Sequence, residues 1–124
     1  MDVTPLVPKG QQIIQSYAQS RFKVSGETYD SAIIVSPERT VAWDVHDVDT
    51  LQVDDFSSLI ACKGQHDVVL LGVGKTMMAI PAELRLSLKK QGLNVDFMDT
   101  GAACRTYNVL MAEGRRVVCA LLPA

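Results

Sequence analysis

The strongest constraint on the fold is the C-terminal stretch 67–123, in which three apolar runs alternate with two helical segments. The run 68–71 is apolar throughout and too short for a helix, so it predicts a buried strand. The run 117–122 is the most apolar of the chain and is expected at the centre of a sheet, whereas Asp96 gives the run 95–98 a less buried position. The order strand–helix–strand–helix–strand predicts parallel pairing with right-handed crossovers.

Residues with well-defined terminal preferences mark the two helices. Pro81 suits the first position of the first helix, where its missing N–H costs nothing, and Gly92 ends that helix. Asp99 or Thr100 caps the second helix, and Gly114 closes it.

The N-terminal half is rich in short β-type runs. Residues 31–35 form a continuous apolar and β-branched run that is expected to be buried on both faces, and Val41, Trp43 and Val45 alternate with polar or small residues. Further strands are predicted at 13–17 and 21–24, and a short helix runs from Asp54 or Asp55 to Cys62. Hairpin connections between these strands imply antiparallel pairing.

The expected fold class is therefore α/β (α+β): a mixed β-sheet covered by helices, with a C-terminal βαβαβ unit and an N-terminal β-meander. Residues 1–10 carry two prolines and a glycine and are expected to form a flexible arm. Residues 11–124 are expected to form a single domain, since 124 residues match the common domain size.

Composition excludes several classes of function. The formal net charge of −2 lacks the basic surplus of a general nucleic-acid binder and disfavours an anionic membrane surface. Three widely spaced cysteines suggest neither a disulfide framework nor a metal pair. There is no secretory signal, no mitochondrial presequence and no apolar run of about 20 residues, so a cytoplasmic protein without direct membrane insertion is expected.

The loop 72–76 reads Gly-Val-Gly-Lys-Thr and ends like a phosphate-binding P-loop. The full motif needs a glycine where Val69 stands and a helix starting at the Lys-Thr pair, whereas Pro81 marks a later start. The Gly-x-Gly-x-x-Gly motif of dinucleotide-binding loops is also incomplete, because Met77 stands where the third glycine would be. Two interpretations remain: the glycines permit a tight strand exit with close helix packing, or loop N–H groups and Lys75 form a weaker anion site.

Two further clusters have a chemical and a structural interpretation. The acidic segment 44–49 could offer oxygen ligands and one imidazole to a metal, but it lacks the glycine and glutamate of a calcium loop, so a solvated acidic loop is favoured. Cys104 lies in the first turn of a predicted helix, where the dipole could lower its pKa. No histidine is near it in sequence, so packing is favoured, as is a structural role for His66.

The C-terminal half contains a distinctive combination of segments: Leu-Leu-Gly-x-Gly at 70–74, Thr-Tyr-Asn at 106–108, Glu-Gly-Arg at 113–115 and Ala-Leu-Leu-Pro at 120–123. Together with N-terminal positions such as Tyr17, they resemble the domain of unknown function 498 family over nearly the whole chain. The resemblance implies a compact three-layer sandwich around a mixed sheet. The family includes NADH dehydrogenase (complex I) assembly factor 3, a non-enzymatic factor that works with a partner protein, and it has no established catalytic residues.

A bacterial-type protein-interaction or assembly module is thus the first hypothesis, with respiratory complex subunits or an assembly partner as its target. The second hypothesis is a small anion-binding or ligand-binding protein, or an enzyme, that uses the loop 72–76 and the start of the second helix. Both point to the carboxyl edge of the parallel strands. No catalytic residue, metal or cofactor is expected. The candidate binding residues are Gly72, Gly74, Lys75, Thr100, Arg105, Thr106, Tyr107 and Asn108. In the structural alternative, Thr100 caps the helix while Thr106 and Asn108 satisfy backbone groups.

Overall fold

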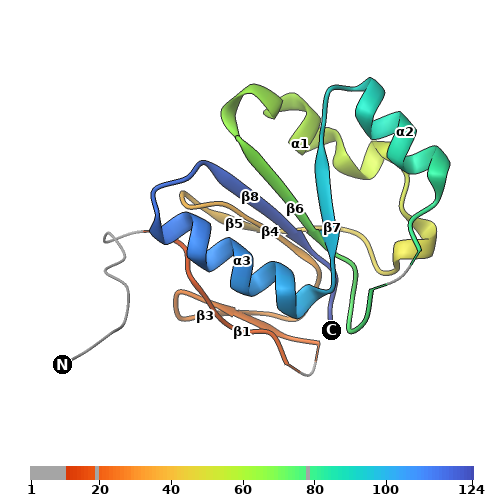
Figure 1. Ribbon diagram of the computed structural model, residues 1–124. Helices are drawn as coiled ribbons and strands as arrows, with labels where there is room; N and C mark the ends of the chain where they lie inside the picture. The colour runs from red at the N-terminus through yellow and green to blue at the C-terminus, as the bar shows by residue number, and fades with distance from the viewer. Residues whose placement is uncertain (1–10, 19, 78) are drawn as a thin grey trace.

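The computed structural model describes residues 11–18, 20–77 and 79–124, so the predicted arm at 1–10 lies outside the described residues. Among these residues, one mixed sheet has five strands in the order β5–β4–β8–β6–β7. The strands span, in that order, Thr40–Ala42, Ile33–Val35, Val117–Leu121, Val68–Gly72 and Val95–Met98. β6 is parallel to both β8 and β7, whereas β4 is antiparallel to β8 and β5 (Figure 1). The predicted parallel βαβαβ unit is confirmed.

Strand position follows the hydrophobicity of each segment. β8 is buried along its whole length at the centre of the sheet, and β4 is also fully buried. β7 lies at one edge and exposes Asp96, as its composition predicted. Continuous apolar runs mark strands that are covered on both faces.

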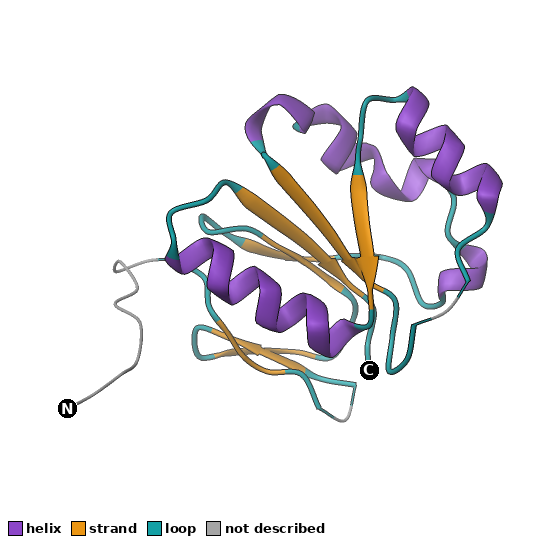
Figure 2. Ribbon diagram, viewed as in Figure 1, coloured by secondary structure: helices purple, strands orange, loops and turns teal. Residues whose placement is uncertain are grey.

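Helices cover both faces of this sheet (Figure 2). α3 (Thr100–Ala112) lies on one face, where its Tyr107 and Met111 share a core with Leu70 of β6. α1 (Ser57–Ala61), α2 (Ala82–Lys90) and the short 3-10 turns η1 (Val48–Thr50), η2 (Val53–Phe56) and η3 (Lys63–Gln65) belong to the other face. There the core includes Phe56 and Leu84, and the Trp43 and Phe56 rings meet edge to face at 5.4 Å.

The N-terminal β-meander is divided between two sheets. β1 (Ile14–Ser16), β2 (Phe22–Val24) and β3 (Glu27–Tyr29) form a separate antiparallel sheet beside α3, while β4 and β5 extend the main sheet. β3 was not predicted, because its residues are mostly polar and exposed. β5 ends at Ala42, short of the alternating pattern that continues to Val45. The layers are thus α1 and α2, the main sheet, and α3 with the small sheet.

Candidate functional site

The carboxyl ends of β6 and β7 lie together, as expected for parallel neighbours. Gly72 is in register with Met98, so the loop 72–76 and the start of α3 leave the sheet side by side. This is the edge at which α/β sheets commonly bind ligands.

The two loops are in direct contact rather than flanking a crevice. The Thr100 N–H donates to the Gly74 carbonyl at 2.8 Å, and the Gly74 N–H donates to Thr100 Oγ1 at 2.9 Å. The Thr100 hydroxyl in turn donates to the Leu122 carbonyl at 2.7 Å, and the Leu122 N–H donates to the Gly72 carbonyl at 2.9 Å. Thr100 is completely buried. Its side chain therefore joins three chain segments at the carboxyl edge of the sheet.

Close packing explains the glycine at position 72. A Cβ placed on Gly72 would lie 2.8 Å from Thr100 Cα and 2.9 Å from Leu121 Cδ2, which is closer than such atoms approach. Gly74 has a φ of +120°, a backbone conformation that side-chain-bearing residues rarely adopt. These contacts support the interpretation of the loop as a tight strand exit.

The cap of α3 is Asp99 rather than Thr100. Its carboxylate accepts a hydrogen bond from the Ala102 N–H at 2.8 Å, which satisfies one of the free donors of the first turn. The Thr100 hydroxyl is thus available for its contacts with the neighbouring segments.

A surface depression of about 290 Å³ opens on the other side of the loop 72–76. The acidic segment 46–49 also lines it, so that His46, Asp47 and Asp49 share the depression with Lys75. One lysine beside two carboxylates does not make a strongly anion-attracting surface. The Gly74 N–H, which an anion would need, already donates to a threonine hydroxyl.

The polar residues of α3 hold the N-terminal segment. Tyr107 Oη donates to the Gln12 carbonyl at 2.8 Å. The Asn108 amide makes two bonds with the backbone of Ile14, accepting from its N–H at 2.9 Å and donating to its carbonyl at 2.8 Å. The prediction that Asn108 satisfies backbone groups is confirmed, and the Thr-Tyr-Asn segment positions β1 against α3.

The remaining two candidates on α3 lie further out. Arg105 Nη1 donates to Tyr17 Oη at 2.9 Å, close to Gly101. Thr106 is half-buried, and within the described residues its hydroxyl is not among the side chains of α3 that make hydrogen bonds. Sequence reasoning missed Tyr17 and Gln12 as partners of this helix, because about 90 residues separate them from it.

The cysteines of the core are poorly suited to nucleophilic chemistry. Burial raises the pKa of the Cys104 thiol to about 12, and this effect outweighs the opposite effect of the adjacent Arg105. Burial also raises the pKa of Cys119 well above its ordinary value. At neutral pH both are buried thiols, Cys104 on α3 and Cys119 within β8. In the part of the chain that the structure describes, no three His, Cys, Asp or Glu side chains are grouped so as to hold a metal ion.

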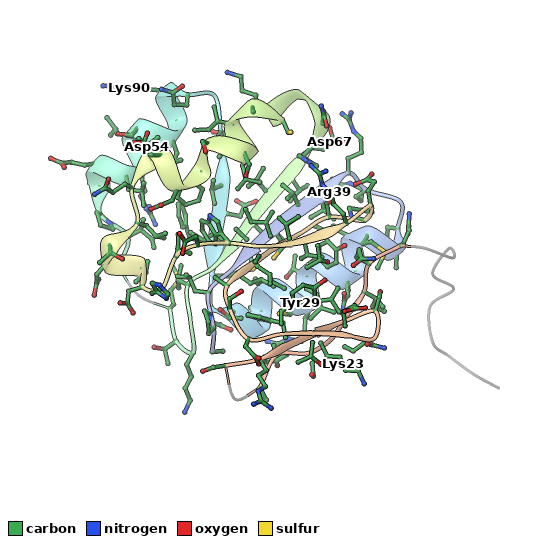
Figure 3. The ribbon with its side chains drawn as sticks, turned by 180° about the vertical axis from the view of Figure 1, so that it is seen from behind. Lys23, Tyr29, Arg39, Asp54, Asp67 and Lys90 are labelled. Carbon is green, nitrogen blue, oxygen red and sulfur yellow. The ribbon has the colours of Figure 1, made fainter. Side chains whose placement is uncertain are left out.

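A second polar cluster lies at the opposite end of the sheet, where Asp67 precedes β6 (Figure 3). Arg116 donates to both Asp67 oxygens, at 2.7 and 3.1 Å, and this pairing holds the pKa of the exposed carboxyl below its ordinary value. Partial burial lowers the pKa of the neighbouring His66.

A family model described as "Protein of unknown function (DUF498/DUF598)" matches residues 14–122. The chain belongs to this family. It is 34% identical to an uncharacterised protein of Rhodobacter capsulatus. The aligned 110 residues cover 89% of this chain and 83% of that protein. It is 32% identical over 111 residues to the NADH dehydrogenase (ubiquinone) 1 alpha subcomplex assembly factor 3 of Danio rerio, covering 90% of this chain. The chain spans 64% of that relative, slightly less than two thirds of its length.

A solved family structure has the same fold. The crystal structure described as an outer membrane protein from Bartonella henselae superposes with a TM-score of 0.81 at 32% identity, covering 92% of this chain and 96% of that one. Over the residues described here, none of the helices is both long enough and apolar enough to cross a membrane.

Proposed function

We propose that this protein is a non-catalytic interaction module that assists the assembly or maturation of a membrane-bound respiratory NADH dehydrogenase. The observation that carries this proposal is the 32% identity to a protein named as an assembly factor of that complex, over 90% of the chain. Its targets are subunits of the complex or a dedicated assembly partner. A cytoplasmic location goes with this role.

The chemistry of the carboxyl edge supports a binding role without catalysis. Thr100 at this edge is engaged in hydrogen bonds within the protein, and so are the candidates Tyr107 and Asn108 further along α3. The Cys104 thiol, near the start of α3, is protonated and buried at neutral pH. A module of this kind recognises its partner with its outer surface.

Affinity capture from native cells tests the proposal. The protein carries a C-terminal tag and is expressed at its natural level, and membranes are solubilised in mild detergent. The expected result is enrichment of NADH dehydrogenase subunits over a tagged unrelated protein. Recovery of no subunit of the complex, with the tagged protein intact, contradicts the proposal. Cell fractionation tests the location, and recovery in the outer membrane contradicts it.

A second candidate function is binding of a small ligand in the depression beside Lys75. It is favoured by the volume of about 290 Å³ at the carboxyl edge of the parallel strands. Titration with inorganic phosphate, followed by amide chemical shifts, tests it. Saturable shifts confined to residues 46–49 and 72–76 support a site, and unchanged shifts at millimolar phosphate contradict an anion site there.

A further inference from the structure

The main sheet ends in an open edge at β7. Among the described residues, β7 pairs with β6 on one side and with no strand on the other. A strand paired on one side turns every second N–H and C=O outward, where another extended chain can pair with them. At four residues, Val95–Met98, the edge is short and can receive a short extended segment.

A groove of about 380 Å³ runs beside this edge, between β7 and α2. Its apolar floor includes Leu88 and Leu93 from the core, together with Val95 and Phe97 of β7. Leu86 on the α2 wall is 57% exposed, unlike the buried leucines of the same helix. The groove thus offers apolar surface to the alternate side chains of a strand added at the edge.

The charged side chains on the α2 side of this groove are cationic. Arg85 and Lys89 are one helical turn apart and both are exposed. The Arg85 guanidinium lies 5.1 Å from the centroid of the Phe97 ring, so it is held at the groove. Within the described parts of the chain, neither cation is paired with a carboxylate. Asp96 also borders the groove, but it alternates with Phe97 along β7, so its side chain leaves the strand on the face opposite to α2.

We propose that β7 and the α2 groove bind an extended segment of a partner protein, added as a further strand, in which apolar residues alternate with acidic ones. Apolar side chains of that segment enter the groove over Phe97 and Leu86, and carboxylates pair with Arg85 and Lys89. This inference rests on the proposed function, because it takes the ligand to be a partner protein. It adds which surface of this chain binds that partner and which kind of segment the partner supplies.

Charge argues against a second copy of this chain as the occupant. A two-fold pairing of β7 with β7 would bring the Arg85 and Lys89 of both copies to one interface, where like charges repel. The chain as a whole carries a net charge of −2, so the positive charge of Arg85 and Lys89 at this groove is opposite in sign to the net charge of the protein. Cations near an edge strand can also prevent pairing with other strands. Peptide binding distinguishes this protective role from recognition of a partner.

The test uses a capped nine-residue peptide that alternates valine with glutamate, titrated into the full chain and followed by amide chemical shifts. Saturable shifts along β7 and α2 are expected. Lys89→Glu is expected to weaken binding by about fivefold. Lys90→Glu, the matched control, changes the same charge in the same turn at a residue that projects away from the molecule at the end of α2 (Figure 3). It should change the affinity by less than about twofold.

Two peptide variants test the mode of binding without changing the protein. N-methylation of alternate backbone nitrogens removes the donors of an added strand and should abolish binding. Replacing the glutamates by lysines should do the same if charge recognition is correct. Equal binding of either variant, equal effects of the two lysine substitutions, or no binding of the parent peptide overturns the proposal. If the parent peptide does not bind, the remaining role of Arg85 and Lys89 is to prevent other strands from pairing with β7.

Failure of this inference is distinguishable from failure of the proposed function. In a strain lacking the gene, the Lys89→Glu and Lys90→Glu variants are each reintroduced. If β7 is the docking surface, Lys90→Glu restores assembled NADH dehydrogenase and Lys89→Glu does so poorly. Equal restoration by both contradicts the docking surface and keeps the assembly role. Unimpaired assembly in the empty strain contradicts the assembly role, while peptide binding still decides the surface.

Discussion

Replacing Thr100 by valine removes one hydroxyl and keeps the shape of the side chain. That hydroxyl donates to the buried Leu122 carbonyl and accepts from the half-buried Gly74 N–H. Leaving a buried carbonyl without a partner costs about 1–3 kcal/mol, and the lost bond to a half-buried N–H costs about 0.5–1.5 kcal/mol. We expect the free energy of unfolding to fall by about 2–4 kcal/mol. This is a large share of the roughly 5–15 kcal/mol that is typical of a domain.

Thermal and urea unfolding, followed by circular dichroism, measure this loss. For 124 residues the entropy of unfolding is about 0.26 kcal/mol/K, so Tm should fall by roughly 8–15 °C. Thr100→Ser keeps the hydroxyl and loses one methyl group, and should cost only about 1 kcal/mol.

Thr106→Val is the matched control, because this residue lies on the same helix and its hydroxyl is not among the hydrogen-bonding side chains of α3 within the described residues. It should change the free energy of unfolding by less than about 0.5 kcal/mol. The reasoning is refuted if Thr100→Val is as stable as the wild type, or if both valine variants lose stability equally. Either result would mean that the bonds at Thr100 do not join the three segments.

Four other features give further predictions. Gly72→Ala should lower the free energy of unfolding by about 1–3 kcal/mol in urea melts, since its Cβ would meet backbone. Asn108→Ala should speed hydrogen exchange in β1 more than in β8, because it frees the β1 backbone. A thiol reagent at pH 8 should label Cys62 in the folded protein and reach the two buried cysteines only on unfolding. Because burial lowers the pKa of His66, the unfolded chain binds its proton first, so stability should fall as pH drops through about 6.5; pH-dependent urea melts of His66→Gln should lack this component.

The C-terminal unit could be predicted from sequence because its signals are local. A four-residue apolar run, a proline at a helix start and a glycine at a helix end each act within one turn or strand. Asp96 indicates a less buried strand because a charge is poorly tolerated where both faces are covered, and β7 does lie at an edge of the sheet. These features place β6, β7 and α3 without knowledge of any distant contact.

The contacts of the N-terminal half could not be predicted in the same way. Asn108 bonds to Ile14 across 94 positions, and nothing near either residue identifies the other. The same holds for the acidic segment 46–49, which also lines the depression beside Lys75. Aspartate and threonine are both common capping residues, so the sequence leaves Asp99 and Thr100 as alternatives; in the structure Asp99 is the cap and the threonine hydroxyl bonds to the buried Leu122 carbonyl. Polar residues in a family-specific segment can serve folding as readily as binding.

The amount of assembled NADH dehydrogenase in a strain lacking this gene tests the central claim most directly. Solubilised membranes are separated on native gels, and the complex is measured by its NADH-oxidising activity in the gel and by the abundance of its subunits. We predict a loss of the mature complex with accumulation of partly assembled subunits, restored by the wild-type gene. A normal amount of mature complex in the strain without the gene contradicts the account.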